Sequence, residues 1–434
     1  MRISLVSEHA SPLALLDGQN VAGQDAGGQN VYVAELSAAL VRRGHAVTVF
    51  TRRDSDRLHW EQELPNGVRL VNVDAGPPQP IPKGQLLPYI PRFAEQLVEY
   101  WCEEPPHVVH GHFWMSGIAS IEAVGRLQKR ALPPPAVAET FHALGVVKRR
   151  HHGADHTSPP EREFLEPWVA RSVDRVVAMS PAEAFELRGF GVSRRRISIA
   201  PCGVDVDVFT PDGPSRPRGQ RVRLAVVGRL VPRKGIETAV SALSLLAAMG
   251  QRDLELLVVG GSQPKESIAA DPEARRLRDL ADSLGVGPQV IFTGRVPRGE
   301  MPEVLRSVDV VVCPPWYEPF GIVPLEAMAC SVPVIASAVG GLTETVIDGV
   351  TGIHVQPRDP IALADAIGLL ARSPQLRLRL GAAGTDRVRT RYTWDCVAAD
   401  TERIYRAMRD HWEQPEADVA SSRSRLRRVE EGSR

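Results

Sequence analysis

The chain has 434 residues, of which 43% are hydrophobic and 24% are charged, a composition typical of a globular protein with two domains. Its formal net charge of zero argues against a nucleic-acid-binding protein, which normally carries a basic excess on its binding face. The five cysteines lie far apart and form no CxxC pair, which disfavours both a disulfide framework and a zinc site.

The chain begins MRISLVSEH, a short apolar run followed by polar residues, and this run is too short for the apolar core of a signal peptide. No stretch approaches the roughly 20 consecutive apolar residues that a membrane span needs. We therefore expect a cytoplasmic protein without a transmembrane segment. Peripheral contact with a membrane and the oligomeric state stay open.

In the first half, short apolar runs alternate with helical patterns. Val33, Leu36 and Leu40 fall on one face of a helix over residues 31–41, and Gly44 ends that helix. Strands are expected at residues 3–6, 46–50, 68–73, 108–110, 136–140, 173–179 and 197–199. Because strands that alternate with helices form a parallel sheet covered on both faces, this half is predicted to be an α/β domain.

A linker follows, since the segment TPDGPSRPRGQ has three prolines and two glycines among polar residues. It divides the chain into an N-terminal domain of residues 1–209 and a C-terminal domain of residues 210–393. Further strands are expected at residues 224–227, 254–259, 290–293, 308–312 and 332–336, with helices at 235–248, 272–284 and 324–330. A last helix, at about 394–412, is expected to pack back on the first domain, and residues 413–434 are expected to be a disordered tail.

The most specific motif is WYEPFGIVPLE, in which Glu318 lies in a loop and Glu326 lies in the following helix. The first N–H groups of a helix suit a diphosphate. These groups are contributed by Phe320, Gly321, Ile322 and Val323. A carboxylate before the helix can bind sugar hydroxyls, and one within it can reach ribose hydroxyls. Taken alone, two glutamates at this spacing are common by chance and are equally explained as a helix cap and a surface residue.

The sequence contains no GxGxxG, which disfavours a nicotinamide-dependent dehydrogenase, and no GxxxxGK[ST] phosphate loop. In doubly wound sheets, ligands bind beyond the carboxyl ends of the strands. Two such domains would therefore hold a ligand between them.

The WYEPFGIVPLE stretch resembles the signature of family-4 retaining glycosyltransferases of the GT-B fold, a group that includes sucrose and sucrose-phosphate synthases and mycothiol-pathway glycosyltransferases. The resemblance covers residues 1 to about 410, through the segments GGQNVYV, HGHFW, TFHAL, VGRLVPRKG, PVIA and GGLTE. It implies two Rossmann-like, doubly wound parallel-sheet domains that face a cleft. It also implies a retaining transferase that moves a hexose-type sugar from a nucleotide-diphosphate donor to a small hydroxyl acceptor, such as a sugar, a sugar phosphate or a cyclitol.

The resemblance assigns four catalytic residues: His142, Arg229, Lys234 and Glu318. In the family, the histidine hydrogen-bonds the transferred sugar and the two cations neutralise the departing diphosphate. Interactions that strengthen as this negative charge develops accelerate the reaction. Solvated surface charges are the alternative for Arg229 and Lys234.

Donor contacts are further expected from Gly28, in a loop that closes over donor and acceptor in the family, and from Arg295, which resembles the residue that meets the base in uridine-nucleotide users. UDP is therefore favoured over GDP or ADP. Candidate acceptor-side residues are Gly27, Asn30, Lys83, His112 and Arg162. The mycothiol-type enzymes that bind a phosphorylated polyol usually have Tyr where this chain has Phe113 and Thr where it has Ala143. Two polar contacts to such an acceptor are therefore missing here. Lys83 and Arg162 could form a phosphate site or could be surface charges.

A DxD sequence, Asp205-Val206-Asp207, resembles the metal site of metal-dependent transferases, but it lies in a GVD turn common in the metal-independent GT-B group. We therefore expect no metal and no cofactor. A GT-B nucleotide-sugar epimerase and a catalytically silent sugar-nucleotide-binding protein are the competing hypotheses. An enzyme of the glycogen-phosphorylase type would need a lysine linked to pyridoxal phosphate.

Overall fold

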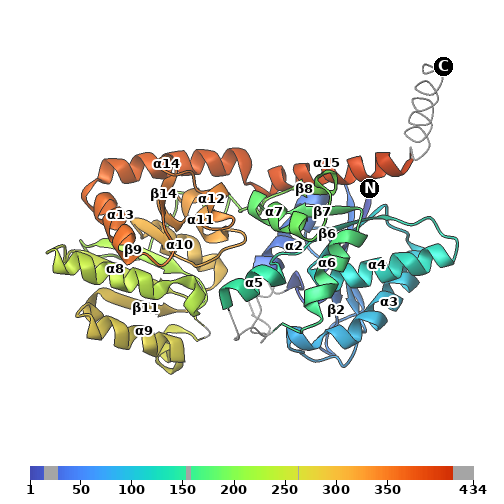
Figure 1. Cartoon of the computed structure of the whole chain (residues 1–434), viewed down its shortest axis with the longest axis horizontal. Coiled ribbons are helices and arrows are strands. Elements are labelled where there is room, and N and C mark those ends of the chain that lie inside the picture. The colour runs from blue at the N-terminus through green and yellow to red at the C-terminus, as the bar shows by residue number, and fades with distance from the viewer. Residues whose placement is uncertain (14–27, 153–157, 262, 414–434) are drawn as a thin grey trace, which may run out of the picture.

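A computed structural model of the chain describes residues 1–13, 28–152, 158–261 and 263–413. Gly27 and the expected tail from residue 414 onward lie outside these residues. Two sheets, each with its own helices, lie side by side along the long axis of the molecule (Figure 1). We call them the first and second units.

The first unit contains an eight-stranded sheet of order β3-β4-β2-β1-β5-β6-β7-β8, parallel except where β3 pairs antiparallel with β4. Its strands are β1 (Arg2–Val6), β2 (Ala46–Arg52), β3 (Glu61–Glu63), β4 (Arg69–Val73), β5 (Val108–His112), β6 (Ala136–Thr140), β7 (Arg175–Ala178) and β8 (Ile197–Ile199). Its helices are α2 (Gly28–Arg42), α3 (Ile90–Glu103), α4 (Trp114–Lys129), α5 (Gly145–His152), α6 (Arg162–Ser172) and α7 (Pro181–Gly189).

The second unit contains a six-stranded parallel sheet of order β11-β10-β9-β12-β13-β14. Its strands are β9 (Val222–Val227), β10 (Leu254–Val259), β11 (Val290–Gly294), β12 (Val310–Cys313), β13 (Val334–Ser337) and β14 (Gly352–Val355). Its helices are α8 (Ile236–Ala248), α9 (Pro272–Ser283), α10 (Met301–Arg306), α11 (Ile322–Ala329), α12 (Leu342–Thr345), α13 (Pro360–Arg372) and α14 (Pro374–Arg391).

Both sheets are doubly wound. The strand order reverses between β1 and β5 in the first unit and between β9 and β12 in the second. A ligand site is expected at each reversal, outside the carboxyl ends of the two strands. The predicted α/β architecture of two doubly wound parallel sheets is confirmed.

Several predicted boundaries differ from the structure. The strand expected at residues 108–110 continues to His112, where buried partners meet both ring nitrogens of His110 and Nδ1 of His112. The helix expected at 324–330 begins earlier, at Ile322, since Gly321 adopts the left-handed conformation that starts it. The strands β3 and β14 were not predicted, and both are only three or four residues long.

The last helix, α15 (Trp394–Glu413), leaves the second unit and lies on the first. Its residues Trp394 and Tyr405 share one hydrophobic core with Leu5 of β1 and Tyr32 of α2. Figure 1 shows α14 along the second unit and α15 along the first, on the same side of the molecule. Among the described helices, none combines the length and the apolar composition required to cross a bilayer.

Candidate active site

The two units touch where the predicted site residues lie. A Cβ atom placed on Gly28, at the start of α2, would lie 2.9 Å from Cδ1 of Ile322 in α11. The rings of His142 and Phe320 have centroids 5.7 Å apart. Residues from the carboxyl ends of both sheets therefore converge, as the position of the two strand-order reversals predicts.

Lys234 and Glu318 form the central ion pair of the second unit. Nζ of Lys234 lies 2.5 Å from Oε2 of Glu318, and the side chains are 19% and 15% exposed. Burial by itself raises the pKa of Glu318, but Lys234, Arg233 and the N–H of Phe320 outweigh it, so the pKa lies below its ordinary value. The carboxylate is therefore charged at neutral pH, and the alternative of a solvated Lys234 is wrong.

Two glycines hold the Glu318 loop close to the end of β13. The N–H of Gly341 donates to the carbonyl oxygen of Glu318 at 2.8 Å. A Cβ on Gly340, whose φ is +51°, would lie 2.2 Å from that same oxygen. The close backbone approach requires glycine at this position, so the GGLTE segment acts as a support for the glutamate loop.

Glu326 lies in α11 with its side chain 6% exposed, so the surface-residue alternative is wrong. Its Oε1 lies 2.7 Å from a guanidinium nitrogen of Arg298. Burial raises the pKa of Glu326 above its ordinary value, against the influence of Arg298. Arg298 was not predicted; its signal in the sequence is its place in the same loop as Arg295, after β11.

Arg229 and Arg295 are both exposed and both follow a strand of the second unit, β9 and β11 respectively. Arg229 lies near enough to Arg233 to help lower its pKa, although burial of Arg233 is the larger cause. The donor roles of these two arginines stay predictions, as do those of Phe320, Gly321, Ile322 and Val323.

His142 follows β6 and has a positive φ of 60°, unusual for a residue with a side chain. Its Nε2 lies 3.0 Å from Nδ1 of His112, while its Nδ1 has no hydrogen-bond partner among the described residues. Burial holds the pKa of His142 well below its ordinary value, with His110, Lys83 and His9 acting in the same direction. His142 is therefore a neutral hydrogen-bonding group.

On the acceptor side, two cations lie over the ring of Phe113. Nζ of Lys83 is 3.6 Å from the ring centroid, and the guanidinium carbon of Arg162 is 4.8 Å from it. Arg162 is 3% exposed and pairs with Glu166 at 2.6 Å, so the alternative of a surface charge is wrong for this residue. Asn30 is also buried and donates to the carbonyl oxygen of Ser11 at 3.2 Å.

The DxD segment forms a local turn. The carboxylate of Asp205 accepts the N–H groups of Asp207 at 2.9 Å and Val208 at 3.2 Å. Within the described ranges, no group of three or more His, Cys, Asp or Glu side chains is arranged to hold a metal ion. All five cysteines are unpaired.

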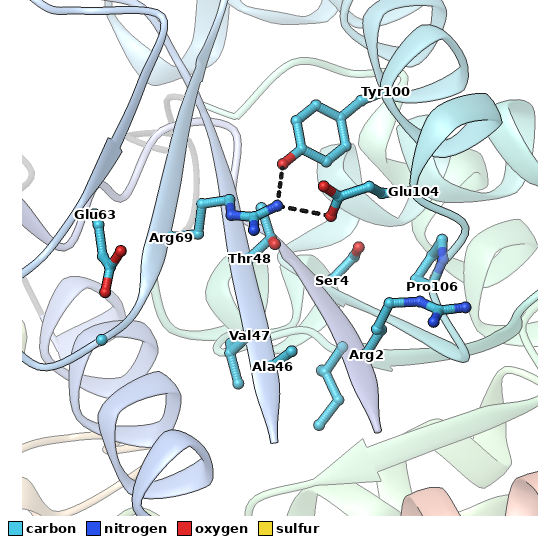
Figure 2. Close-up of a pocket in the computed structure, with 12 residues that line it drawn as sticks. Arg2, Ser4, Ala46, Val47, Thr48, Glu63, Arg69, Tyr100, Glu104 and Pro106 are labelled. Carbon is cyan, nitrogen blue, oxygen red and sulfur yellow. Dashed lines mark hydrogen bonds and ion pairs between the residues drawn. The ribbon is translucent and has the colours of Figure 1, made fainter. Parts of the chain in front are cut away.

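A separate cavity of about 210 Å³ lies at the amino ends of the strands of the first sheet, opposite the carboxyl ends that form the candidate site (Figure 2). It is lined by Arg2, Ala46 and Arg69, which begin β1, β2 and β4. Arg69 forms an ion pair with Glu104 at 2.6 Å, so its charge is already balanced within the protein. This cavity is remote from the converging side chains and is not the candidate active site.

Comparison with known proteins gives the family. Residues 26–208 match the family described as Glycosyltransferase Family 4, and residues 213–387 match Glycosyl transferases group 1. A D-inositol 3-phosphate glycosyltransferase of Acidothermus cellulolyticus is 36% identical over 420 residues, which cover 93% of this chain and 90% of that protein. The chain belongs to glycosyltransferase family 4.

This family-4 glycosyltransferase is also similar to two solved structures. Sucrose-phosphate synthase from Thermosynechococcus elongatus has 33% identity and a TM-score of 0.81, covering 94% of this chain and 98% of that one. Anabaena HepE, solved with UDP and glucose, has a TM-score of 0.67, covers 93% and 99% of the two chains, and at 17% identity supports the fold alone. The predicted family and the GT-B fold are both confirmed.

Proposed function

We propose that this glycosyltransferase moves a hexose-type sugar from a UDP-sugar to a hydroxyl group of a small phosphorylated acceptor, with retention of configuration. The observation that carries the proposal is the meeting of Phe320 with His142 beside the Lys234–Glu318 pair. A sugar held there would have a neutral imidazole on one side and a cation and a carboxylate on the other.

The bond from the sugar's anomeric carbon to the diphosphate breaks, and negative charge grows on the departing UDP. Lys234 and Arg229 are the cations proposed to stabilise that charge, with the N–H groups at the start of α11. The acceptor hydroxyl bonds to the anomeric carbon on the face from which UDP leaves, and its proton passes to a phosphate oxygen of UDP. His142 and Glu318 are proposed to hold the sugar hydroxyls.

The two cations at Phe113 support a phosphorylated acceptor. Lys83 and Arg162 bring two cationic groups to one ring, and the buried one, Arg162, is also paired with Glu166. The relative from Acidothermus is named for D-inositol 3-phosphate, and the structural neighbour is named for a sucrose phosphate. Phe113 and Ala143 lack the hydroxyls usual in the mycothiol-type enzymes, so we propose a sugar phosphate or a cyclitol phosphate without choosing between them.

We further propose that the reaction needs no metal ion. Asp205 is engaged in its own turn, which supports a structural role for the DxD segment. The cytoplasm remains the expected compartment, and the unpaired cysteines are compatible with it.

The test is a mass-spectrometric screen of nucleotide sugars against sugars, sugar phosphates, inositols and inositol phosphates, with and without excess chelator. We expect UDP release only when a phosphorylated acceptor is present, and equal rates with chelator. An isomerised nucleotide sugar formed without acceptor would instead identify an epimerase. Binding without turnover across the whole panel would identify a silent binding protein, and activity that chelator abolishes and magnesium restores would refute metal independence.

A further inference from the structure

A chain of hydrogen bonds connects the last helix to the core of the first sheet. Tyr405 of α15 places its hydroxyl 2.6 Å from Nδ1 of His110 in β5. Nε2 of His110 lies 2.9 Å from Oγ1 of Thr140, and that hydroxyl lies 3.0 Å from the carbonyl oxygen of Val177. All four groups belong to buried residues.

The direction of every bond in this chain follows from the groups themselves. A carbonyl oxygen only accepts, so Thr140 donates its single proton to Val177 and must accept from His110. Burial lowers the pKa of His110 to about 3, so its ring is neutral and carries one proton, on Nε2. Nδ1 of His110 is then an acceptor, and the Tyr405 hydroxyl is its donor.

His110 in turn packs against the histidines of the site. His112 lies two residues further along β5, on the same face of the strand, and the ring centroids of His110 and His112 are 4.3 Å apart. Nδ1 of His112 shares a single hydrogen bond with Nε2 of His142. The same chain also fixes Thr140, which lies two residues before His142 at the end of β6. His142 is thus linked to His110 in two ways, through the ring of His112 and along the backbone from Thr140.

From this geometry we propose that Tyr405 is a positioning residue for His142. The tyrosine hydroxyl sets the tautomer and the orientation of His110, and His110 holds His142, with its unusual backbone conformation, in place for the sugar. Tyr405 belongs to α15, the helix that follows α14 of the second unit and packs on the first. Between α14 and α15, the carbonyl oxygen of Tyr392 accepts the N–H of Val204. The inference rests on the proposed role of His142.

The test compares Tyr405→Phe with Tyr392→Phe. Tyr392 is an equally buried tyrosine beside the same helix. Its hydroxyl donates to the carbonyl oxygen of Glu344 and accepts from the guanidinium of Arg387, and it does not meet the histidines. We expect kcat to fall roughly 10- to 100-fold in Tyr405→Phe, with little change in the KM for the UDP-sugar, because a displaced catalytic group slows the reaction without weakening donor binding. Tyr392→Phe should keep the wild-type kcat.

A double variant separates positioning from general loosening of the fold. In the His142→Ala background, Tyr405→Phe should lower kcat no further, because both changes remove the same function. Effects that multiply would overturn the proposal, as would a wild-type kcat in Tyr405→Phe alone.

A spectroscopic readout distinguishes failure of this inference from failure of the proposed function. The imidazole ¹⁵N signals of His142, assigned by their loss in His142→Ala, should shift in Tyr405→Phe and stay in place in Tyr392→Phe. If the wild-type protein transfers no sugar, the proposed function fails and these signals alone decide the positioning. Unchanged His142 signals in Tyr405→Phe would overturn it.

Discussion

Lys234 and Glu318 neutralise each other in the structure, and a bound diphosphate would compete with the carboxylate for the ammonium group. Lys234→Ala removes this cation while Glu318 keeps Arg233 and the N–H of Phe320 as partners. We therefore expect turnover to fall by about 100-fold or more, in the range seen when one donor to developing charge is removed.

Steady-state kinetics and thermal unfolding of the same preparations would check this expectation. Lys129→Ala, an exposed lysine at the end of α4, is the matched control and should match the wild-type protein. Wild-type turnover by Lys234→Ala would remove the leaving-group assignment.

Glu139 in β6 is a buried carboxyl group whose two oxygens have no hydrogen-bond partner among the described residues. Burial raises its pKa well above the ordinary value of 4.5, and Glu8, Glu166 and Glu183 raise it further. The folded state therefore holds this proton more tightly than the unfolded state does. Stability from this group is fully present below about pH 4.5 and is lost as the pH rises toward the raised value.

Glu139→Gln should remove that loss. The free energy of unfolding of the variant, relative to the wild-type protein, should grow by about 1.4 kcal/mol per pH unit as the pH rises from the ordinary pKa toward the raised one. Urea unfolding at several pH values measures it. A difference that stays constant over this range would show that Glu139 is ionised in the folded protein or hydrogen-bonded in solution.

At the scale of the elements, the Glu318 loop depends on the turn that follows β13. Gly340→Ala adds a Cβ atom 2.2 Å from the carbonyl oxygen of Glu318 at a positive φ, so the loop must move. Gly349→Ala has a similar φ of +71° but meets no atom within 4 Å, and it isolates the conformational cost of about 1–2 kcal/mol.

We expect Gly340→Ala to lose more stability than Gly349→Ala and, unlike it, to bind UDP at least tenfold more weakly, a change of about 1.4 kcal/mol. Calorimetric titration with UDP and thermal unfolding would measure both effects. Equal UDP affinity in the two variants would mean that the GGLTE segment does not support the donor loop.

Short apolar runs between helical patterns predicted most strands, because buried parallel strands such as β10 (Leu254–Val259) are nearly continuous runs of aliphatic residues. The same signal is too weak for a three-residue edge strand such as β3, whose residues are all polar. The site residues could be named from motifs, yet the contacts between them, and those with residues elsewhere in the chain, could not. Tyr405 and His110 are 295 residues apart, and only the packing of α15 on the first sheet brings them together.

At the scale of the whole molecule, the two units are joined by the linker after residue 209 and by the passage from α14 to α15. The contact of Phe320 with His142 occupies the space where a sugar would lie between the units. Binding of a donor should therefore change the relative placement of the units, because the sugar has to displace this contact. Small-angle scattering with and without saturating UDP-sugar measures this change, and an identical envelope in both states would contradict it.

The return of α15 has a consequence for how the protein is made. Leu5 and Tyr405 belong to one core, so the first unit has an incomplete interior until the ribosome has synthesised nearly all of the second. During translation, the apolar side chains of β1 and α2 that share this core with α15 stay open to water and are a natural target for chaperones. A nascent chain stalled just before Trp394 should accordingly remain protease-sensitive in its first half, although every strand of both sheets has already been made.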